Sequence, residues 1–165
     1  MPPSAQARLI GFRVGTELYA LDLMSVRQVA GYTGSTPVAT APAFIEGIIV
    51  LRNEVLPVID LRARLYPELP PADRSLLLIT ETAGRAVALK VDEILRVLTI
   101  EVDALLAAPE VVRQSERGSV LIGIAPYRDE VAMLLDVDAL LTREERKLLA
   151  ESPLDHVARE PDDVG

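Results

Sequence analysis

A nineteen-residue apolar stretch occurs twice in this chain, and the repetition constrains the fold more than any other feature. Residues 47–65 read GIIVLRNEVLPVIDLRARL, and residues 123–141 read GIAPYRDEVAMLLDVDALL. Aligned without gaps, the two stretches share eight of nineteen positions, whereas about one or two matches are expected by chance at ordinary residue frequencies. The pattern indicates an internal duplication.

A second pair of matching segments precedes each copy. YALDLMSVRQV at residues 19–29 lies over VALKVDEILRV at residues 87–97. These two segments are closer together in the chain than the two downstream stretches are, which places an insertion in the second half, at residues 100–119. The chain is therefore organised as two copies of a two-block unit.

Each block is predicted to form a β-hairpin. In the upstream blocks, short apolar runs flank Gly15-Thr16 and Ala83-Gly84, and in the downstream blocks they flank Arg52-Asn53 and Arg128-Asp129. Gly, Asn and Asp tolerate the left-handed backbone that tight hairpin turns require. Short strands at such close spacing favour two small barrels or a sandwich over a βαβ sheet.

Helices are expected only at the ends of the blocks. Asp60 and Asp136 each follow a strand and precede a short helical segment, so each carboxylate is interpreted as an N-cap. Three prolines, Pro67, Pro70 and Pro71, mark the seam between the two halves.

One longer helix is predicted at residues 142–152. Thr142 fits its N-cap, and Glu145 three positions later completes a capping box. Leu148 and Leu149 are expected to face the core.

Composition excludes several classes of partner. There is no cysteine and the net charge is -8, with basic residues scattered among acids. These features indicate a reducing, cytoplasmic location and argue against a nucleic-acid partner. No apolar run approaches the roughly 18 residues of a membrane-spanning helix, so direct membrane insertion is not expected.

Catalytic machinery is not apparent in the sequence. The single histidine, His156, lies in an acidic, non-periodic tail at residues 153–165 that we expect to be disordered. The acid pair Asp136 and Asp138 lacks further ligands at metal-binding spacing, and no glycine-rich phosphate loop occurs. We therefore expect no enzyme activity, metal or cofactor, and favour a binding function. A small-ligand-binding barrel is the alternative of a different class.

Several motifs resemble those of the CheW-like family of bacterial chemotaxis adaptors, and the resemblance extends from about residue 8 to 150. The matching residues follow the order and spacing of the family: Tyr19-Ala20, Ala41-Pro42-Ala43-Phe44-Ile45, Gly47, Leu51-Arg52, Pro57-Val58-Ile59-Asp60-Leu61-Arg62 and Val91-Asp92.

The resemblance implies a fold and a function. The fold is an all-β domain of two SH3-like five-stranded barrels, at about residues 17–66 with an exchanged N-terminal strand and at about residues 75–141, followed by the C-terminal helix. The function is to couple methyl-accepting chemoreceptors to a CheA-type histidine kinase. One barrel face would dock on the regulatory domain of the kinase, and the helical cytoplasmic tip of the receptor would lie near the groove between the barrels. A rival within the family is a competitor or decoy that sequesters array components.

Four positions are carried over by motif as partner contacts: Val26, Gln28, Gly47 and Arg52. From the residues alone, Arg52 fits a solvated turn residue as well as an interface anchor.

Three positions depart from the family pattern. Val50 and Asn53 stand in a hairpin where relatives commonly have Asn-Leu-Arg-Gly, and Gln28 stands where relatives often have Glu. A pairing of Gln28 with Arg52 would then be a neutral hydrogen bond rather than an ion pair. These departures suggest a divergent paralogue in an alternative or pilus-motility array.

Overall fold

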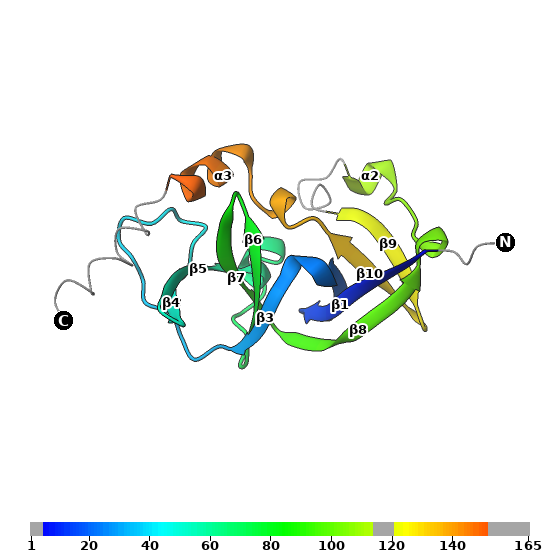
Figure 1. The fold of residues 1–165 in the computed structure, drawn as a ribbon, viewed down its shortest axis with the longest axis horizontal. Helices are drawn as coiled ribbons and strands as arrows, with labels where there is room; N and C mark the ends of the chain where they lie inside the picture. Colours follow the sequence, from blue (N-terminus) through cyan, green and yellow to red (C-terminus); the bar gives the residue numbers. More distant parts are fainter. Residues whose placement is uncertain (1–4, 114–120, 152–165) are drawn as a thin grey trace.

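The computed structural model describes residues 5–113 and 121–151, which form strands joined by a few short helices (Figure 1). In chain order the elements are β1 (Gln6–Val14), β2 (Glu17–Asp22), the 3-10 helix η1 (Leu23–Ser25), β3 (Val26–Gly31), β4 (Gly47–Leu51), β5 (Glu54–Asp60), α1 (Leu61–Leu65), β6 (Leu76–Thr82), β7 (Arg85–Val91), β8 (Glu93–Glu101), η2 (Val102–Ala104), α2 (Glu110–Arg113), β9 (Leu121–Tyr127), β10 (Glu130–Leu135), η4 (Asp138–Leu140) and α3 (Arg143–Ala150). The predicted tail at residues 153–165 lies outside the described residues.

All four predicted hairpins are confirmed. β1 pairs with β2, β4 with β5, β6 with β7 and β9 with β10, each antiparallel. The turns adopt the left-handed backbone expected of them, with φ of 63° at Gly15, 52° at Arg52, 63° at Asn53 and 54° at Arg128.

The strands form two five-stranded sheets of the same design. One has the order β3-β6-β7-β5-β4 and is called the central barrel; the other has the order β8-β1-β2-β10-β9 and is called the terminal barrel. The all-β prediction with a C-terminal helix is therefore confirmed. The predicted division into barrels at residues 17–66 and 75–141 is wrong, because each barrel combines a hairpin of one half with three strands of the other.

Chain length explains this exchange of hairpins. In the terminal barrel the place beside β1 is taken by β8, which runs antiparallel to β1 and so parallel to β2. For β3 to take that place, the chain would have to return along the whole of β2, roughly 20 Å. The three residues of η1 span at most about 10 Å. Strand β3 therefore continues into the other barrel, where it pairs with β6.

The pairing registers confirm the duplication. Val58 of β5 lies opposite Ala88 of β7 in a parallel pair, and Leu134 of β10 lies opposite Ala20 of β2 in the other parallel pair. The two sequence alignments carry one pair onto the other, because they match Val58 with Leu134 and Ala20 with Ala88. The edge strands β3 and β8 also have matching irregularities in their pairing with β6 and β1.

Three apolar cores hold the chain together. Each barrel has its own interior, and a larger third core lies between the barrels and includes Phe12, Leu21, Leu61, Leu89 and Leu149. Because strands and helices from both halves bury side chains in this shared core, the barrels pack as one body.

Helix α3 lies over the shared core, with Leu149 fully buried. The predicted capping box is confirmed: Thr142 accepts a hydrogen bond from the Glu145 amide, and Glu145 accepts one from the Thr142 amide. The prediction that Leu148 faces the core is wrong, because this residue is 46% exposed. Consecutive helical residues point about 100° apart, so this short helix buries only one of the two leucines.

Candidate protein-interaction site

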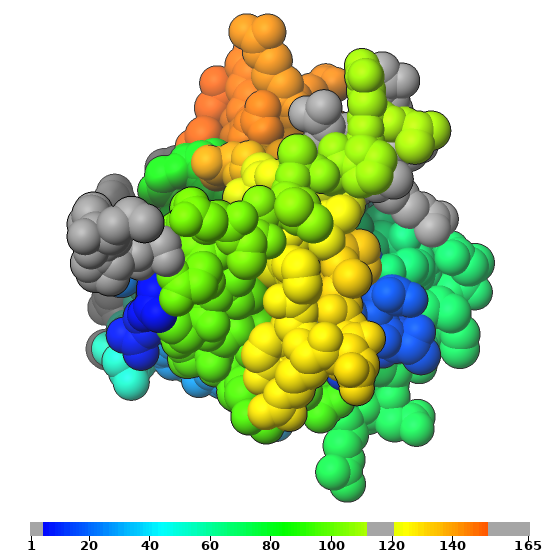
Figure 2. Space-filling view, turned by 90° about the vertical axis from the view of Figure 1, so that its right-hand side faces the viewer, coloured from blue at the N-terminus to red at the C-terminus, as the bar shows by residue number. Residues whose placement is uncertain are grey.

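An apolar groove of about 640 Å³ opens on the terminal barrel where the chain crosses to the central barrel. Its walls come from the start of β1, η1, the start of β9 and the segment after β10, with Leu9, Leu134 and Leu135 as apolar lining. Two large apolar side chains in this lining are open to solvent: Met24 is 90% exposed and Ile122 is 58% exposed. Exposed apolar side chains gathered around a groove are typical of a protein-docking surface. Figure 2 shows the side of the molecule that exposes segments of both β8 (green) and β9 (yellow), the two edge strands of this sheet.

Acidic side chains surround this apolar lining. Asp22, Glu81, Asp136 and Asp138 line the groove, and Arg8 is the one basic residue among its lining residues. Asp22 accepts a hydrogen bond from the Met24 amide at 3.0 Å, which caps η1. The groove thus combines apolar anchors with a negative rim.

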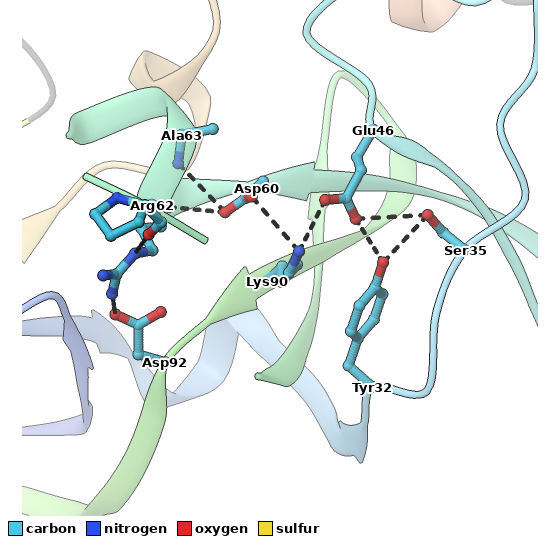
Figure 3. Close-up of polar contacts among 9 residues, drawn as sticks. Tyr32, Ser35, Glu46, Asp60, Arg62, Ala63, Lys90 and Asp92 are labelled. Carbon is cyan, nitrogen blue, oxygen red and sulfur yellow. Dashed lines mark hydrogen bonds and ion pairs between the residues drawn. The ribbon is translucent and has the colours of Figure 1, made fainter. Parts of the chain in front are cut away.

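A second group of polar side chains joins segments of the central barrel (Figure 3). The Lys90 ammonium, at the end of β7, donates to Glu46 at 2.8 Å and lies 3.5 Å from a carboxylate oxygen of Asp60. Tyr32 donates to the other oxygen of Glu46 at 2.6 Å, and its ring lies 4.7 Å from the Lys90 ammonium. Lys90 therefore lies at the centre of a cluster that joins three segments: the residue before β4, the end of β5 and the residue after β3.

The charges in this group reinforce one another. Burial alone would raise the pKa of Glu46, but hydrogen bonds from Lys90 and Tyr32 outweigh it and lower that pKa. Burial alone would lower the pKa of Lys90, but the hydrogen bond to Glu46 and the charge of Asp60 raise it. Burial, together with the hydrogen bond to Glu46, raises the pKa of Tyr32. Glu46 and Lys90 therefore form a charged pair at neutral pH.

A second ion pair continues the same cluster. Arg62 donates to Asp92 at 2.6 Å and to the Pro70 carbonyl at 2.6 Å, while the Gly15 amide donates to Asp92 at 2.5 Å. Asp60 caps α1 through the Arg62 and Ala63 amides, which confirms its predicted role. Asp136 accepts from the Asp138 amide at 3.0 Å, but the N-cap of η4 is Val137, so the predicted N-cap role of Asp136 is wrong.

Two of the four predicted contact residues lie together on β3, an edge strand of the central barrel. Val26 and Gln28 are half-buried, and the exposed residues of this strand are Arg27, Val29 and Gly31. Gln28 is therefore only partly accessible to a partner. The side chain of Arg27 reaches the neighbouring β4-β5 hairpin, where it lies 3.9 Å from Glu54.

The other two predicted residues have different surroundings. Arg52 is exposed at the tip of the β4-β5 hairpin. Within the described part of the chain, no hydrogen bond joins Gln28 to Arg52. Gly47 is buried under the loop that precedes β4, where an added Cβ would lie 2.6 Å from the Ser35 hydroxyl and 2.8 Å from the Thr36 carbonyl. Its surface is not available to a partner, and its role is to let that loop pack closely.

Sequence reasoning missed the groove residues Met24 and Ile122 and the Lys90-Glu46 pair. A signal for some of them was present in the repeat, because the alignment of residues 19–29 with 87–97 places Asp22 over Lys90 and Met24 over Asp92. A change of charge at matched positions of a duplication marks a place where the two copies have diverged.

Two further hollows open on the described residues, one of about 770 Å³ whose lining includes Lys90 and Asp92, and one of about 680 Å³ whose lining includes Glu81 and Arg146. No three His, Cys, Asp or Glu side chains within residues 5–113 and 121–151 converge on a metal-sized site. His156 lies outside the described residues. None of the described helices has the length and apolar character that crossing a membrane requires.

Comparison with known proteins decides the family. Residues 8–145 match the CheW-like domain. The chain belongs to the CheW-like family. This CheW-like chain is 33% identical over 140 residues to the chemotaxis protein CheW of Rhizobium meliloti, covering 84% of this chain and 90% of the relative. It is 31% identical over 141 residues to the CheW of Klebsiella aerogenes, covering 84% and 83% of the two chains.

A solved structure agrees with this assignment. The scaffolding protein TtCheW from Thermoanaerobacter tengcongensis superposes with a TM-score of 0.74 at 29% sequence identity, covering 86% of this chain and 90% of the other. The CheW-like chain therefore shares its fold along most of its length with a chemotaxis scaffold.

Proposed function

We propose that this CheW-like chain is a non-enzymatic adaptor that couples chemoreceptors to a CheA-type histidine kinase. The observation that supports the proposal is that two separate surfaces expose apolar side chains, the groove of the terminal barrel and the β3 edge with the β4-β5 hairpin of the central barrel. An adaptor needs two such surfaces, because it must hold two partners at once.

The groove fits the helical tip of a receptor. An amphipathic helix docks by inserting apolar side chains spaced by three or four residues into an apolar groove. Met24 and Ile122 are exposed where they can contact such side chains, above the apolar lining of Leu9, Leu134 and Leu135. The acidic rim favours a helix that carries basic residues beside its apolar stripe.

The central barrel fits the regulatory domain of the kinase. Val26 and Gln28 on β3 and Arg52 at the hairpin tip would contact that domain, while Gly47 would act indirectly by supporting β4. Val29 and Val50 add exposed apolar area on the same two elements. Arginine beside exposed apolar side chains is a common composition at the centre of interfaces.

Co-elution tests the kinase contact. Purified chain and the C-terminal regulatory domain of the kinase, mixed at tens of micromolar, should elute as one complex in gel filtration. Two separate peaks would contradict the proposal. A thermal-shift screen of small metabolites in parallel checks the rival function of a ligand-binding barrel.

Kinase activity distinguishes an adaptor from a decoy. In a mixture of receptor fragment and kinase, an adaptor raises the rate of kinase autophosphorylation, whereas a competitor lowers it. The same mixture without receptor provides the control, because the rise depends on coupling.

A further inference from the structure

Met24 is, at 90%, the most exposed large apolar side chain among the described residues. It lies in η1, the short turn that forms one wall of the groove of the terminal barrel. Its neighbour Leu23 packs against the shared core, so the turn buries one side chain and presents the next to solvent. A side chain this exposed contributes little to folding, because apolar stabilisation scales with the area removed from water. Its place in the groove points to a role in docking instead.

Hydrogen bonds fix the backbone that carries Met24. Asp22 accepts from the Met24 amide at 3.0 Å, and the Ser25 hydroxyl donates to the Asp22 carbonyl at 2.7 Å. In the other copy of the repeat the matched residue is Asp92, which accepts from Arg62 and from a turn amide and so serves the fold. The terminal barrel has a methionine at this position, and its side chain is available to a partner.

The thioether sulfur of an exposed methionine can be oxidised. Hydrogen peroxide transfers one oxygen atom to the sulfur and is itself reduced to water, so that the sulfur gives up two electrons and becomes a sulfoxide. The other methionine of the described chain, Met133 of β10, is only partly exposed and packs against the shared core. Met1 lies outside the described residues. Peroxide should therefore oxidise Met24 before Met133.

Oxidation would change the groove at the point where a helix docks. A sulfoxide replaces an adaptable apolar side chain by a polar one, whose oxygen accepts hydrogen bonds. That oxygen can be satisfied by water or by Arg8, the one basic residue among the lining residues. The apolar stripe of a docked helix would displace the water and supply no donor in its place. Oxidation should therefore weaken docking without disturbing the fold.

We propose that Met24 is an oxidation site that controls the groove, so that peroxide weakens receptor docking and methionine sulfoxide reductase restores it. The inference rests on the proposed function of the groove. The reductase takes two electrons from a dithiol and releases the oxygen as water. The kinase contact should keep its affinity, because no methionine lies on β3 or on the β4-β5 hairpin.

Peptide mass spectrometry of the full chain tests the site. During treatment with hydrogen peroxide, the peptide that contains Met24 should gain one oxygen at least about tenfold faster than the peptide that contains Met133. The melting temperature should not change while Met24 alone is oxidised, because its side chain is exposed. Oxidation of Met133 at an equal or higher rate overturns the proposal.

Calorimetry tests the effect on docking, after catalase has removed the peroxide. Binding of a soluble chemoreceptor tip hairpin to the oxidised chain should be at least about tenfold weaker than to the unmodified chain. Both classes of sulfoxide reductase with dithiothreitol should restore it, since peroxide produces both sulfoxide epimers. Binding of the kinase regulatory domain should be the same before and after oxidation. Unchanged hairpin binding by the oxidised chain overturns the proposal.

Three variants assign the effect to one sulfur. Met24→Leu keeps an apolar side chain without sulfur, so its affinity for the hairpin should be the same before and after peroxide. Met24→Gln carries a polar side chain of similar length and should bind weakly without any peroxide. Met133→Leu is the matched control, and peroxide should weaken its binding as it does in the unmodified chain. Peroxide sensitivity that persists in Met24→Leu overturns the proposal.

Failure of the proposed function gives a different result. If the unmodified chain binds no receptor hairpin, the groove is not a receptor site, and control of docking by Met24 is overturned with it. If the unmodified and oxidised chains bind the hairpin equally, the receptor site stands and only its control by oxidation is overturned.

Discussion

Arg64 of α1 and Glu145 of α3 form an ion pair with two hydrogen bonds that ties the C-terminal helix to the middle of the chain. Glu145 also completes the capping box of α3, so one carboxylate both starts the helix and anchors it. The helix begins after the last strand of the terminal barrel and contacts α1, which follows β5 of the central barrel (Figure 1). The pair therefore helps to hold the two barrels in one arrangement.

A double-mutant cycle measures this pair. Arg64→Met and Glu145→Gln should show a coupling free energy of about 1 kcal/mol in urea unfolding, since both side chains are partly buried. The more exposed pair of Arg13 and Glu130 has the same two-bond geometry and serves as the control. That pair should show a smaller coupling, because Glu130 is more exposed than Glu145 and solvent screens its charge.

Acid should weaken the cluster around Lys90. The pKa of Glu46 is lowered from its ordinary value of 4.5, because the hydrogen bonds from Lys90 and Tyr32 outweigh the effect of burial. A depressed pKa contributes stability that is present above the unfolded-state pKa and is lost as pH falls through the folded-state value. Urea unfolding between pH 7 and pH 3 should therefore show a loss of stability on acidification that is smaller in Glu46→Gln. The exposed Glu144→Gln variant is the control, and an equal pH dependence in all three proteins would contradict the prediction.

Two glycines at matched positions should differ in their tolerance of a side chain. Gly47→Ala places a Cβ within 2.8 Å of a backbone carbonyl, whereas Gly123→Ala places one 3.2 Å from the Leu106 carbonyl. Gly47→Ala should lower the free energy of unfolding by about 1–3 kcal/mol, and Gly123→Ala by less. Thermal melts of both variants check the order, which a larger loss for Gly123→Ala would refute.

Arg52 should contribute to partner binding and not to folding. Its side chain is exposed at a hairpin tip, so Arg52→Ala should leave the melting temperature within about 2 °C of the unmodified value. Binding of the kinase regulatory domain should weaken at least about tenfold. Arg128→Ala, at the matched tip of the other barrel, is the control. A lower melting temperature with unchanged binding would instead make Arg52 a structural turn residue.

The hairpin exchange predicts how fragments behave. In both barrels every contact between a hairpin and the rest of its sheet joins one half of the chain to the other. Residues 1–72 and 73–165 should therefore lack a cooperative melt when separate and form a one-to-one complex with native circular dichroism when mixed. Independent folding of either fragment would contradict this expectation.

Much of the fold could be predicted because it depends on local patterns. Turn residues and strand periodicity located four hairpins, and the Thr142-Glu145 spacing located α3. The assignment of strands to barrels could not be predicted from these patterns. It depends on how far the short η1 connection can reach after β2 has paired, which is a property of the assembled sheet.

The site was less accessible to sequence reasoning. Arg52 could be placed at a hairpin tip from turn chemistry, but the burial of Gly47 depends on Ser35 and Thr36, which lie in a loop without periodicity. The Lys90-Glu46 pair joins residues 44 positions apart. The one sequence signal for this pair is that the alignment of the two matched segments places Lys90 at the position of Asp22.

The order of the strands also affects how the chain folds as it leaves the ribosome. All five strands of the central barrel lie between residues 26 and 91, so this barrel can close while synthesis continues. In the first hairpin, β1 can pair with β8 once Glu101 has been added, but β2 must wait for β10, which ends at Leu135. Until then the nascent protein exposes the unpaired edge of β2, and a chaperone that shields this edge would act during that interval.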